Sequence, residues 1–153
     1  TPLEFARLGC TLGRGNPDEL MARWASYWPA VRAVDELLPA DATVLLVGES
    51  RAMYLDRDVI VEDPLVTPLL VALAEAQPSA AAMAAELRRR GVTHVLYNHQ
   101  EATRIAALNG RDEYLAPLSP AGRARLEAFL SGCLRPLAAA GPVELLALAG
   151  CER

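Results

Sequence analysis

A stripe of apolar side chains at helical spacing marks the first regular segment of the chain. Asn16 can cap a helix there, and Pro17 suits its first position. Because Pro29 cannot donate a hydrogen bond to the carbonyl of Ala25, the pattern predicts either a kink or two successive helices meeting at Trp28. The apolar stripe recurs every three or four residues and consists of Leu20, Trp24, Tyr27, Val31, Val34 and Leu38.

Four short apolar runs predict β-strands, at residues 43–47, 58–61, 92–97 and 143–148. The run at 43–47 is continuously apolar and rich in β-branched residues, so we expect it at the centre of the sheet, with both faces buried. Helices are expected between these strands. This alternation predicts a three-layer α/β fold, in which helices cover both faces of a Rossmann-like, mainly parallel four-stranded sheet.

The expected helices occupy residues 65–76, 79–90, 100–108 and 119–137. In the last of them, Ser119 is the expected N-cap and Pro120 occupies the first helical position. The apolar face of this helix is expected to comprise Leu126, Phe129, Leu130, Cys133, Leu134 and Leu137. A length of 153 residues fits one domain. We therefore expect a single α/β domain at 27–153, with residues 1–26 as a connector and the start of the first helix.

Composition and charge exclude several functional classes. The net charge of −4 argues against nucleic acid as a partner. All fifteen basic residues are arginine, which removes lysine-based mechanisms such as Schiff bases. The apolar runs are too short to span a membrane, which takes about 18 residues. The chain opens at Thr1 without methionine or leader, so we expect it to be excised from a longer protein.

The three cysteines are Cys10, Cys133 and Cys151, an odd number without the paired short spacings of zinc sites. We therefore expect no metal site. In an oxidising compartment one disulfide can form, and Cys151 near the tail is the favoured partner for another cysteine.

Two strand-to-helix loops, at residues 48–51 and 98–101, carry the candidate site, because ligands of open parallel sheets bind beyond the carboxyl ends of the strands. Arg51 is their one cation, so we expect it to anchor an anionic ligand such as a lipid phosphate or a sugar acid. In the alternative interpretations, Arg51 pairs with Glu49, Asp56 or Glu101 and fixes its loop, or the loops are only tight turns with helix caps. The candidate ligand-binding residues are Glu49, Ser50, Arg51, Asn98 and His99.

The segment Gly48-Glu49-Ser50 resembles the nucleophile region of the SGNH-type hydrolases. Those enzymes need a late aspartate and histidine, whereas this chain has only His94 and His99. Without a base the serine hydroxyl is a weak nucleophile, so we assign no catalytic residue. The second and third glycines of a dinucleotide loop are also missing, and we expect no cofactor. His94, inside a predicted strand, is expected to be a half-buried structural histidine.

Four segments resemble the soluble C-terminal domain of bacterial multi-pass membrane glycosyltransferases, in the protein mannosyltransferase and aminoarabinose transferase class. They are YWPAV at 27–31, LPADATVLLVGESR at 38–51, YLDR at 54–57 and LRRRGVTHVLYN at 87–98, within a resemblance that covers residues 27–148. It implies a domain outside the cytoplasmic membrane, following the last transmembrane helix of the same polypeptide, in an enzyme that uses polyprenyl-phosphate sugars. The catalytic acids of that class lie on early membrane loops, so none carries over to this chain.

Two functions therefore stay open. The first is a non-catalytic accessory or binding domain of a membrane glycosyltransferase, with the transmembrane region and a polyprenyl-phosphate sugar or an acceptor as partners. The second is an autonomous α/β domain that binds a small molecule or acts as an SGNH-like hydrolase. Whether the chain is itself an enzyme depends on which of these holds.

Overall fold

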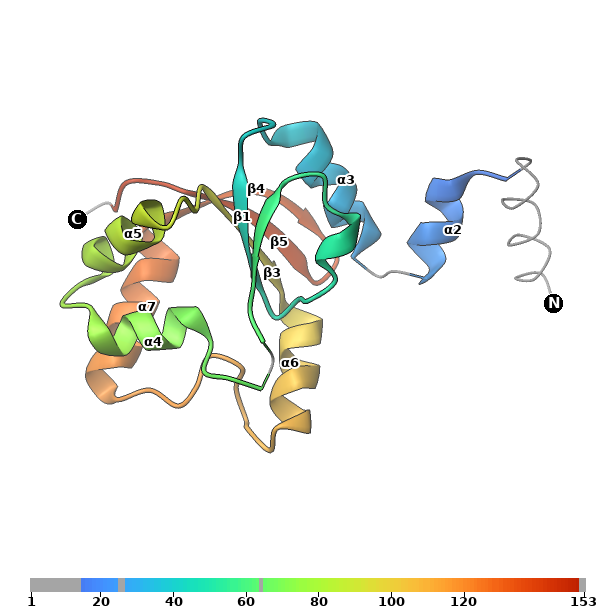
Figure 1. Cartoon of the computed structure of the whole chain (residues 1–153). Helices are drawn as coiled ribbons and strands as arrows, with labels where there is room; N and C mark the ends of the chain where they lie inside the picture. The colour runs from blue at the N-terminus through green and yellow to red at the C-terminus, as the bar shows by residue number, and fades with distance from the viewer. Residues whose placement is uncertain (1–14, 25–26, 64, 152–153) are drawn as a thin grey trace.

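The computed structural model describes residues 15–24, 27–63 and 65–151, and these form a five-stranded sheet in the order β2-β1-β3-β5-β4 (Figure 1). β1 (Thr43–Val47) pairs in parallel with β2 (Asp58–Val61) and with β3 (His94–Asn98). β5 (Val143–Leu148) runs antiparallel to β3 and to β4 (Leu134–Ala140). The α/β class is confirmed. The expected four-stranded, mainly parallel sheet is corrected to a mixed sheet, with β3 rather than β1 in the central position.

The additional strand, β4, replaces the end of the expected helix at 119–137. Helix α7 (Pro120–Gly132) begins at the Ser119 cap as predicted but ends at Gly132. Leu134 and Leu137 have a spacing that fits a helix, yet both lie in β4, which pairs with β5. Pro136 would break a helix interior, whereas an edge strand with a bulge next to it tolerates proline.

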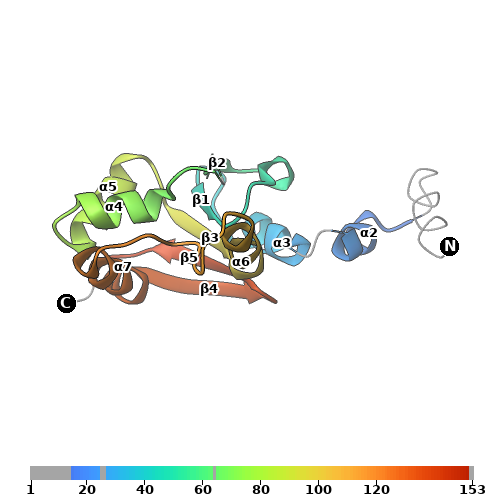
Figure 2. The same ribbon diagram turned by 90° about the horizontal axis from the view of Figure 1, so that it is seen from below.

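The first apolar stripe forms two successive helices, as the sequence predicts. α2 (Pro17–Trp24) is followed by α3 (Trp28–Leu37), which begins at Trp28 and has Pro29 in its first turn. α2 protrudes from the domain beyond α3 (Figures 1 and 2). Residues 1–14 of the expected connector and the side chain of Trp24 lie outside the described residues.

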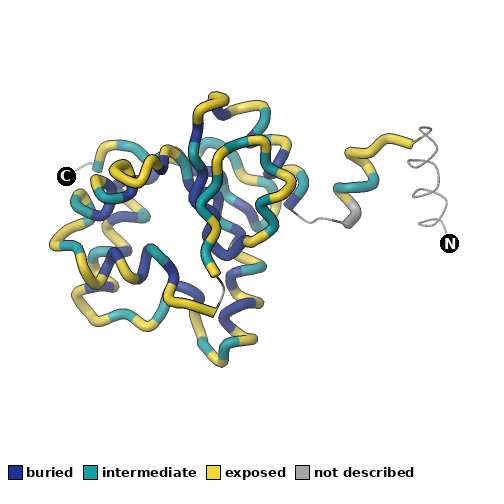
Figure 3. The backbone as a smooth tube through the Cα atoms, in the orientation of Figure 1, coloured by how far each residue is buried: buried dark blue, intermediate teal, exposed yellow. Residues whose placement is uncertain are grey.

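Two apolar cores lie on the two faces of the sheet, and alternate residues of β1 point into each. Leu45 and Val47 join the core formed with α4 (Leu69–Ala76), α5 (Ala80–Arg89), α6 (His99–Leu108) and α7. Val44 and Leu46 join the second core, which includes Val31 and Val34 of α3. β1 and β3 are accordingly mostly buried, whereas the edge strands β2 and β4 are largely half-buried or exposed (Figure 3). Helices therefore cover both faces, and α6 continues from the lower end of the sheet, where β1 and β3 end (Figure 1).

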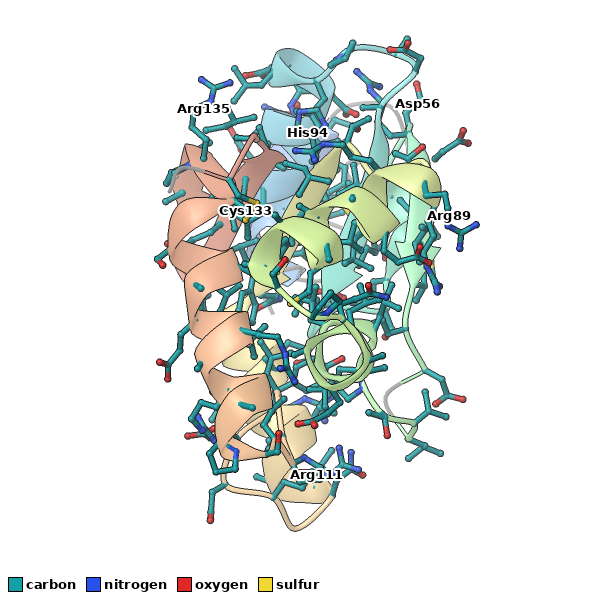
Figure 4. All side chains as sticks on the ribbon, turned by 90° about the vertical axis from the view of Figure 1, so that its left-hand side faces the viewer. Asp56, Arg89, His94, Arg111, Cys133 and Arg135 are labelled. Atoms are coloured by element: carbon teal, nitrogen blue, oxygen red, sulfur yellow. A yellow bond between two sulfur atoms is a disulfide. The ribbon has the colours of Figure 1, made fainter. Side chains whose placement is uncertain are left out.

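His94 begins β3 at the opposite end of the sheet from that edge, and Figure 4 shows it far from Arg111, which follows α6. Its Nδ1 lies 2.8 Å from the Thr93 hydroxyl. Burial, with a further contribution from Arg135, holds the pKa of His94 below its ordinary value. His94 is therefore half-buried, as expected.

Candidate functional site

Gly48 brings the loop after β1 into contact with α6. Its φ of +66° lies in the left-handed region, and a Cβ placed on it would stand 2.5 Å from the Cβ of Ala102 and 2.9 Å from the backbone nitrogen of Ala102. A position that close to a helix backbone admits only glycine. Residues 48–51 and 98–101 therefore meet at one edge of the sheet, as predicted, but the expected loop at 98–101 is corrected to the last residue of β3 and the first turn of α6.

Glu49 is a buried carboxylate that accepts five hydrogen bonds from described residues. Its Oε1 accepts from the backbone nitrogens of Ser50 and Arg51, each at 3.0 Å, and from Arg51 Nε at 2.8 Å. Its Oε2 accepts from Arg51 Nη2 at 2.7 Å and from Asn98 Nδ2 at 2.8 Å. Burial alone would raise the pKa of Glu49, but the hydrogen bonds from Arg51 and Asn98 and the Arg51 charge outweigh it and hold the pKa below its usual value. Glu49 is thus a fixed anion inside the loop.

Arg51 is held from two sides. Its guanidinium makes the bidentate ion pair with Glu49 and lies over the ring of Tyr27, 4.4 Å from the centroid. The Tyr27 hydroxyl donates a hydrogen bond to the Arg51 carbonyl, and this bond connects the start of α3 to the loop. Of the expected pairings, the structure therefore has the one with Glu49, while 35% of the Arg51 side chain remains exposed.

Asn98 links the loop to α6. Its Oδ1 accepts from the backbone nitrogen of Glu101 at 3.1 Å and so caps the helix, while its Nδ2 donates to Glu49. Only 2% of the residue is exposed. Asn98 therefore positions its neighbours and does not offer a free amide to a ligand.

Two adjoining cavities open at this edge. The polar cavity, of about 230 Å³, is lined by Arg51, Asn98, Gln100, Glu101 and Arg104. The apolar cleft, of about 150 Å³, is lined by Leu65, Ile105 and Leu108 and by the polar residues Ser50 and Asn109, together with the same Glu101 and Arg104. Arg104 belongs to both cavities and is not among the residues expected from the sequence. Its position three residues after Glu101, on the first turns of α6, is the signal that would have found it.

His99 belongs to a third cavity, so the structure does not bring it together with Arg51. Its ring stacks on Tyr97, with 4.1 Å between ring centroids, and its Nε2 lies 2.8 Å from Glu144 Oε2. This third cavity, of about 210 Å³, is also lined by Asp112, Glu113 and Tyr114. Burial, followed by the nearby Glu113, raises the pKa of Tyr97.

Ser50 is exposed beside the apolar cleft, and within the described residues no hydrogen bond joins its hydroxyl to an imidazole. His94 lies at the other end of the sheet, and His99 pairs with Glu144. The geometry does not provide Ser50 with the general base that a serine nucleophile requires.

Cys133 and Cys151 form a disulfide, with 4.0 Å between their Cα atoms, that joins the end of α7 to the segment after β5 (Figure 4). Cys151 is thus paired as expected, and Cys10 lies outside the described residues. Across the described part of the chain, His, Cys, Asp and Glu do not gather in threes or more as a metal site requires. A search of the same residues finds no helix with the length and apolar character needed to cross a membrane.

Comparisons of the chain with models of protein families, with curated proteins and with solved structures gave no significant match.

Proposed function

We propose that the chain is a non-catalytic binding domain of a membrane glycosyltransferase that uses polyprenyl-phosphate sugars, and that it binds an anionic group in the polar cavity. The observation that carries the binding function is the contact of the loop after β1 with α6, which places Arg51 and Arg104 in the wall of one cavity. With Glu101, the described lining has two guanidinium groups and one carboxylate. A guanidinium can hold a phosphate or a carboxylate with two parallel hydrogen bonds.

The two arginines differ in how freely they can meet a ligand. Arg51 is fixed by the buried Glu49, so it contributes charge from a set position. Arg104 pairs with Glu101 on the helix surface, where 59% of its side chain is exposed. Because an exposed ion pair of this kind contributes little stability, Arg104 can exchange Glu101 for an anionic ligand at small cost.

The proposed location, at the extracytoplasmic face of a bacterial cytoplasmic membrane, has support from the disulfide. Cys133 and Cys151 are bonded to each other, and such bonds persist in oxidising compartments but are rare in the cytosol. The resemblance to the membrane glycosyltransferases gives the membrane region of the same polypeptide as the partner.

Phosphate binding tests the proposed site. Inorganic phosphate should raise the Tm of the 153-residue chain, and Arg104→Gln should reduce that rise at least fivefold. Arg89→Gln is the matched control, because Arg89 pairs with Glu86 at the same i,i+3 spacing on α5 and is 72% exposed. An equal rise in wild type and Arg104→Gln would contradict the site.

Two observations test the rest of the proposal. A gene that encodes membrane-spanning helices upstream of Thr1 supports the glycosyltransferase domain, whereas a start codon close to Thr1 supports the autonomous α/β domain. The chain incubated with polyprenyl-phosphate sugars and acceptors should yield no product. Turnover above a control without protein would contradict a non-catalytic role.

A further inference from the structure

The two outer strands of the sheet, β2 and β4, differ in how well their free edges are protected. They lie at opposite margins of the sheet (Figure 2). β4 carries Pro136, which has no N–H to donate to a further strand, and its register shifts between Pro136 and Ala138. β2 has neither feature, and within the described residues the backbone of 58–61 hydrogen-bonds only to β1. The outward-facing backbone groups of β2 are therefore available to another strand.

Apolar side chains are exposed before and after β2 along the chain. Met53 lies in the short helix η1 (Ala52–Tyr54) before the strand and is 80% exposed, and Leu65 after the strand is 76% exposed. Val61, which ends the strand, and Val66 are exposed as well. β4, which is described along its whole length, has no large apolar residue among its exposed ones. An apolar surface beside an unpaired strand is typical of a binding site for an extended peptide.

Both apolar cores of the domain end at β2. Val59 packs against the core that contains α3, and Ile60 packs against the core that contains α4, but both residues are only half-buried. The neighbouring strand β1, which has a strand on each side, is almost entirely buried. A further strand beside β2 would cover Val59 on one face of the sheet and Ile60 on the other. Such a strand needs apolar residues at successive positions, because successive side chains point to opposite faces.

Exposed aspartates determine the charge of this edge. Asp58 begins β2, Asp56 lies two residues before the strand and Asp63 lies two residues after it, and all three are exposed. The side chain of Arg57 is turned away from this surface, because it is only 10% exposed and donates to backbone carbonyls at and after the end of α3. Within the described residues the carboxylates of Asp56 and Asp58 form no hydrogen bond or ion pair. The edge therefore attracts a partner with basic side chains.

A second copy of the chain is a poor match for this edge. Two antiparallel copies paired with Val59 opposite Ile60 would bring Asp56 of one copy opposite Asp63 of the other, at both ends of the pairing. Like charges opposite each other in a pair of strands are destabilising, and charged side chains are a common protection of edge strands against self-pairing. The aspartates therefore disfavour a second copy and favour a basic strand.

We propose that β2 is a docking edge for an extended segment of another polypeptide, which adds a sixth strand to the sheet. The segment has successive aliphatic residues that extend the two cores beyond Val59 and Ile60, and basic residues on either side that pair with the three aspartates. Backbone hydrogen bonds to β2 supply affinity, and the apolar and basic side chains supply specificity. The edge is separate from the polar cavity, so this inference does not depend on the proposed anion binding.

A synthetic peptide with the sequence Arg-Lys-Val-Ile-Val-Lys-Arg, with blocked ends and a fluorescent label, tests the proposal. Fluorescence anisotropy measures its binding to the 153-residue chain. It should bind at least tenfold more tightly than two comparison peptides, one with glutamate in place of each basic residue and one with Ser-Gly-Ser at its centre. The same basic peptide with methyl groups on its three central backbone nitrogens should not bind, because these nitrogens can no longer donate to the edge of β2.

Variants of the chain separate the charge of the edge from its apolar contacts. Asp56→Asn combined with Asp58→Asn should weaken the basic peptide at least fivefold and reduce the salt dependence of its binding. The matched control is Asp112→Asn combined with Glu127→Gln, which removes two exposed acids outside β2 and its flanking residues and should leave the affinity unchanged. Val61→Thr should weaken the peptide without changing the salt dependence. All five side chains are exposed, and unchanged Tm values would show that folding is preserved.

Hydrogen exchange shows where the peptide binds. Backbone amides at alternate residues of 58–61 should exchange more slowly in its presence, and those of β4 should not change. Slower exchange at β4 instead, or equally tight binding of the methylated peptide, would overturn strand addition at β2. Equal affinities for the basic and acidic peptides would overturn the charge of the partner, and a chain that dimerises alone with β2 protected would make a second copy the occupant. Absence of binding by all of the peptides would overturn the docking edge itself.

Discussion

The carboxylate of Glu49 and the side-chain amide of Asn98, which are 49 positions apart in the sequence, meet in a 2.8 Å hydrogen bond at the edge of the sheet where β1 and β3 end. Both residues are buried, and each also accepts a backbone hydrogen bond, Glu49 from Arg51 in the loop and Asn98 from Glu101 in α6. The bond therefore connects the loop after β1 to the cap of α6. The walls of the polar cavity come from these same two segments, so their spacing depends on this contact.

Asn98→Ala should destabilise the domain by about 2.5–4 kcal/mol. The change removes a helix cap, which contributes about 1 kcal/mol, and a donor to a buried carboxylate, which contributes about 1.5–3 kcal/mol. Urea unfolding measures the difference. Ser79→Ala is the control, because the Ser79 hydroxyl caps α5 through Ala82 without touching a buried charge. Equal losses in the two variants would show that the bond to Glu49 adds no stability.

Gly48→Ala should cost more stability than Gly110→Ala. Both glycines have a left-handed backbone, with φ of +66° and +64°, so both substitutions carry about 1–2 kcal/mol of backbone strain. Only at Gly48 does the new methyl group meet another segment, at Ala102, and overpacking adds about 1–3 kcal/mol. Thermal unfolding of the two variants gives the comparison. Similar Tm values would mean that the loop and α6 are not in the close contact described.

The expected strands at 43–47 and 58–61 coincide with β1 and β2. A continuous apolar run, or one rich in β-branched residues, favours a strand by its own sequence. β4 was not predictable in the same way. Its residues Leu134 and Leu137 fit the helical period, and its pairing with β5, the next strand along the chain, makes it a strand. Gly132 and Pro136 were the local signals against a longer helix.

The candidate site depends on contacts between segments that are far apart in the sequence. The loops were found because they follow strands whose carboxyl ends share one edge. His99 was grouped with Asn98 as its neighbour in sequence, but successive residues of a helix point about 100° apart, and His99 faces Tyr97 and Glu144. The contact of Arg51 with Tyr27 joins α3 to the loop and has no counterpart in sequence spacing.

Acid should weaken the contribution of Glu49 to stability. The pKa of Glu49 in the folded protein lies below the ordinary value of 4.5, so the unfolded chain binds its proton more readily. The contribution is complete above pH 4.5 and is lost as the pH falls through the lower, folded pKa. The excess stability of wild type over Glu49→Gln in urea should therefore be largest at pH 7 and shrink below pH 4.5. The other carboxylates are present in both proteins, so their contributions to the free energy of unfolding cancel in this difference. A difference that is constant from pH 7 to pH 3 would contradict this assignment.

Arg51→Ala should lower the Tm without any ligand present, because it removes both side-chain donors of Arg51 from a carboxylate that is 1% exposed. Loss of one partner of a fully buried pair costs about 3–5 kcal/mol, and the partial exposure of Arg51 reduces this to about 2–3 kcal/mol. If Arg51 served only as a ligand anchor, the same change would abolish stabilisation by phosphate and leave the Tm of the free protein unchanged.

The double variant Arg51→Ala with Glu49→Gln separates the charge of Glu49 from the packing of Arg51. Once Glu49 is neutral, the absence of the guanidinium leaves no buried charge uncompensated, so the double variant should be more stable than the sum of the two single losses predicts. The backbone nitrogens of residues 50 and 51 donate to one carboxylate oxygen and Asn98 Nδ2 donates to the other, so the single oxygen of the glutamine amide keeps only one of these two sets of hydrogen bonds. Strictly additive losses in urea unfolding would mean that the two side chains do not act as a pair, and Arg51 would then be held by Tyr27 alone.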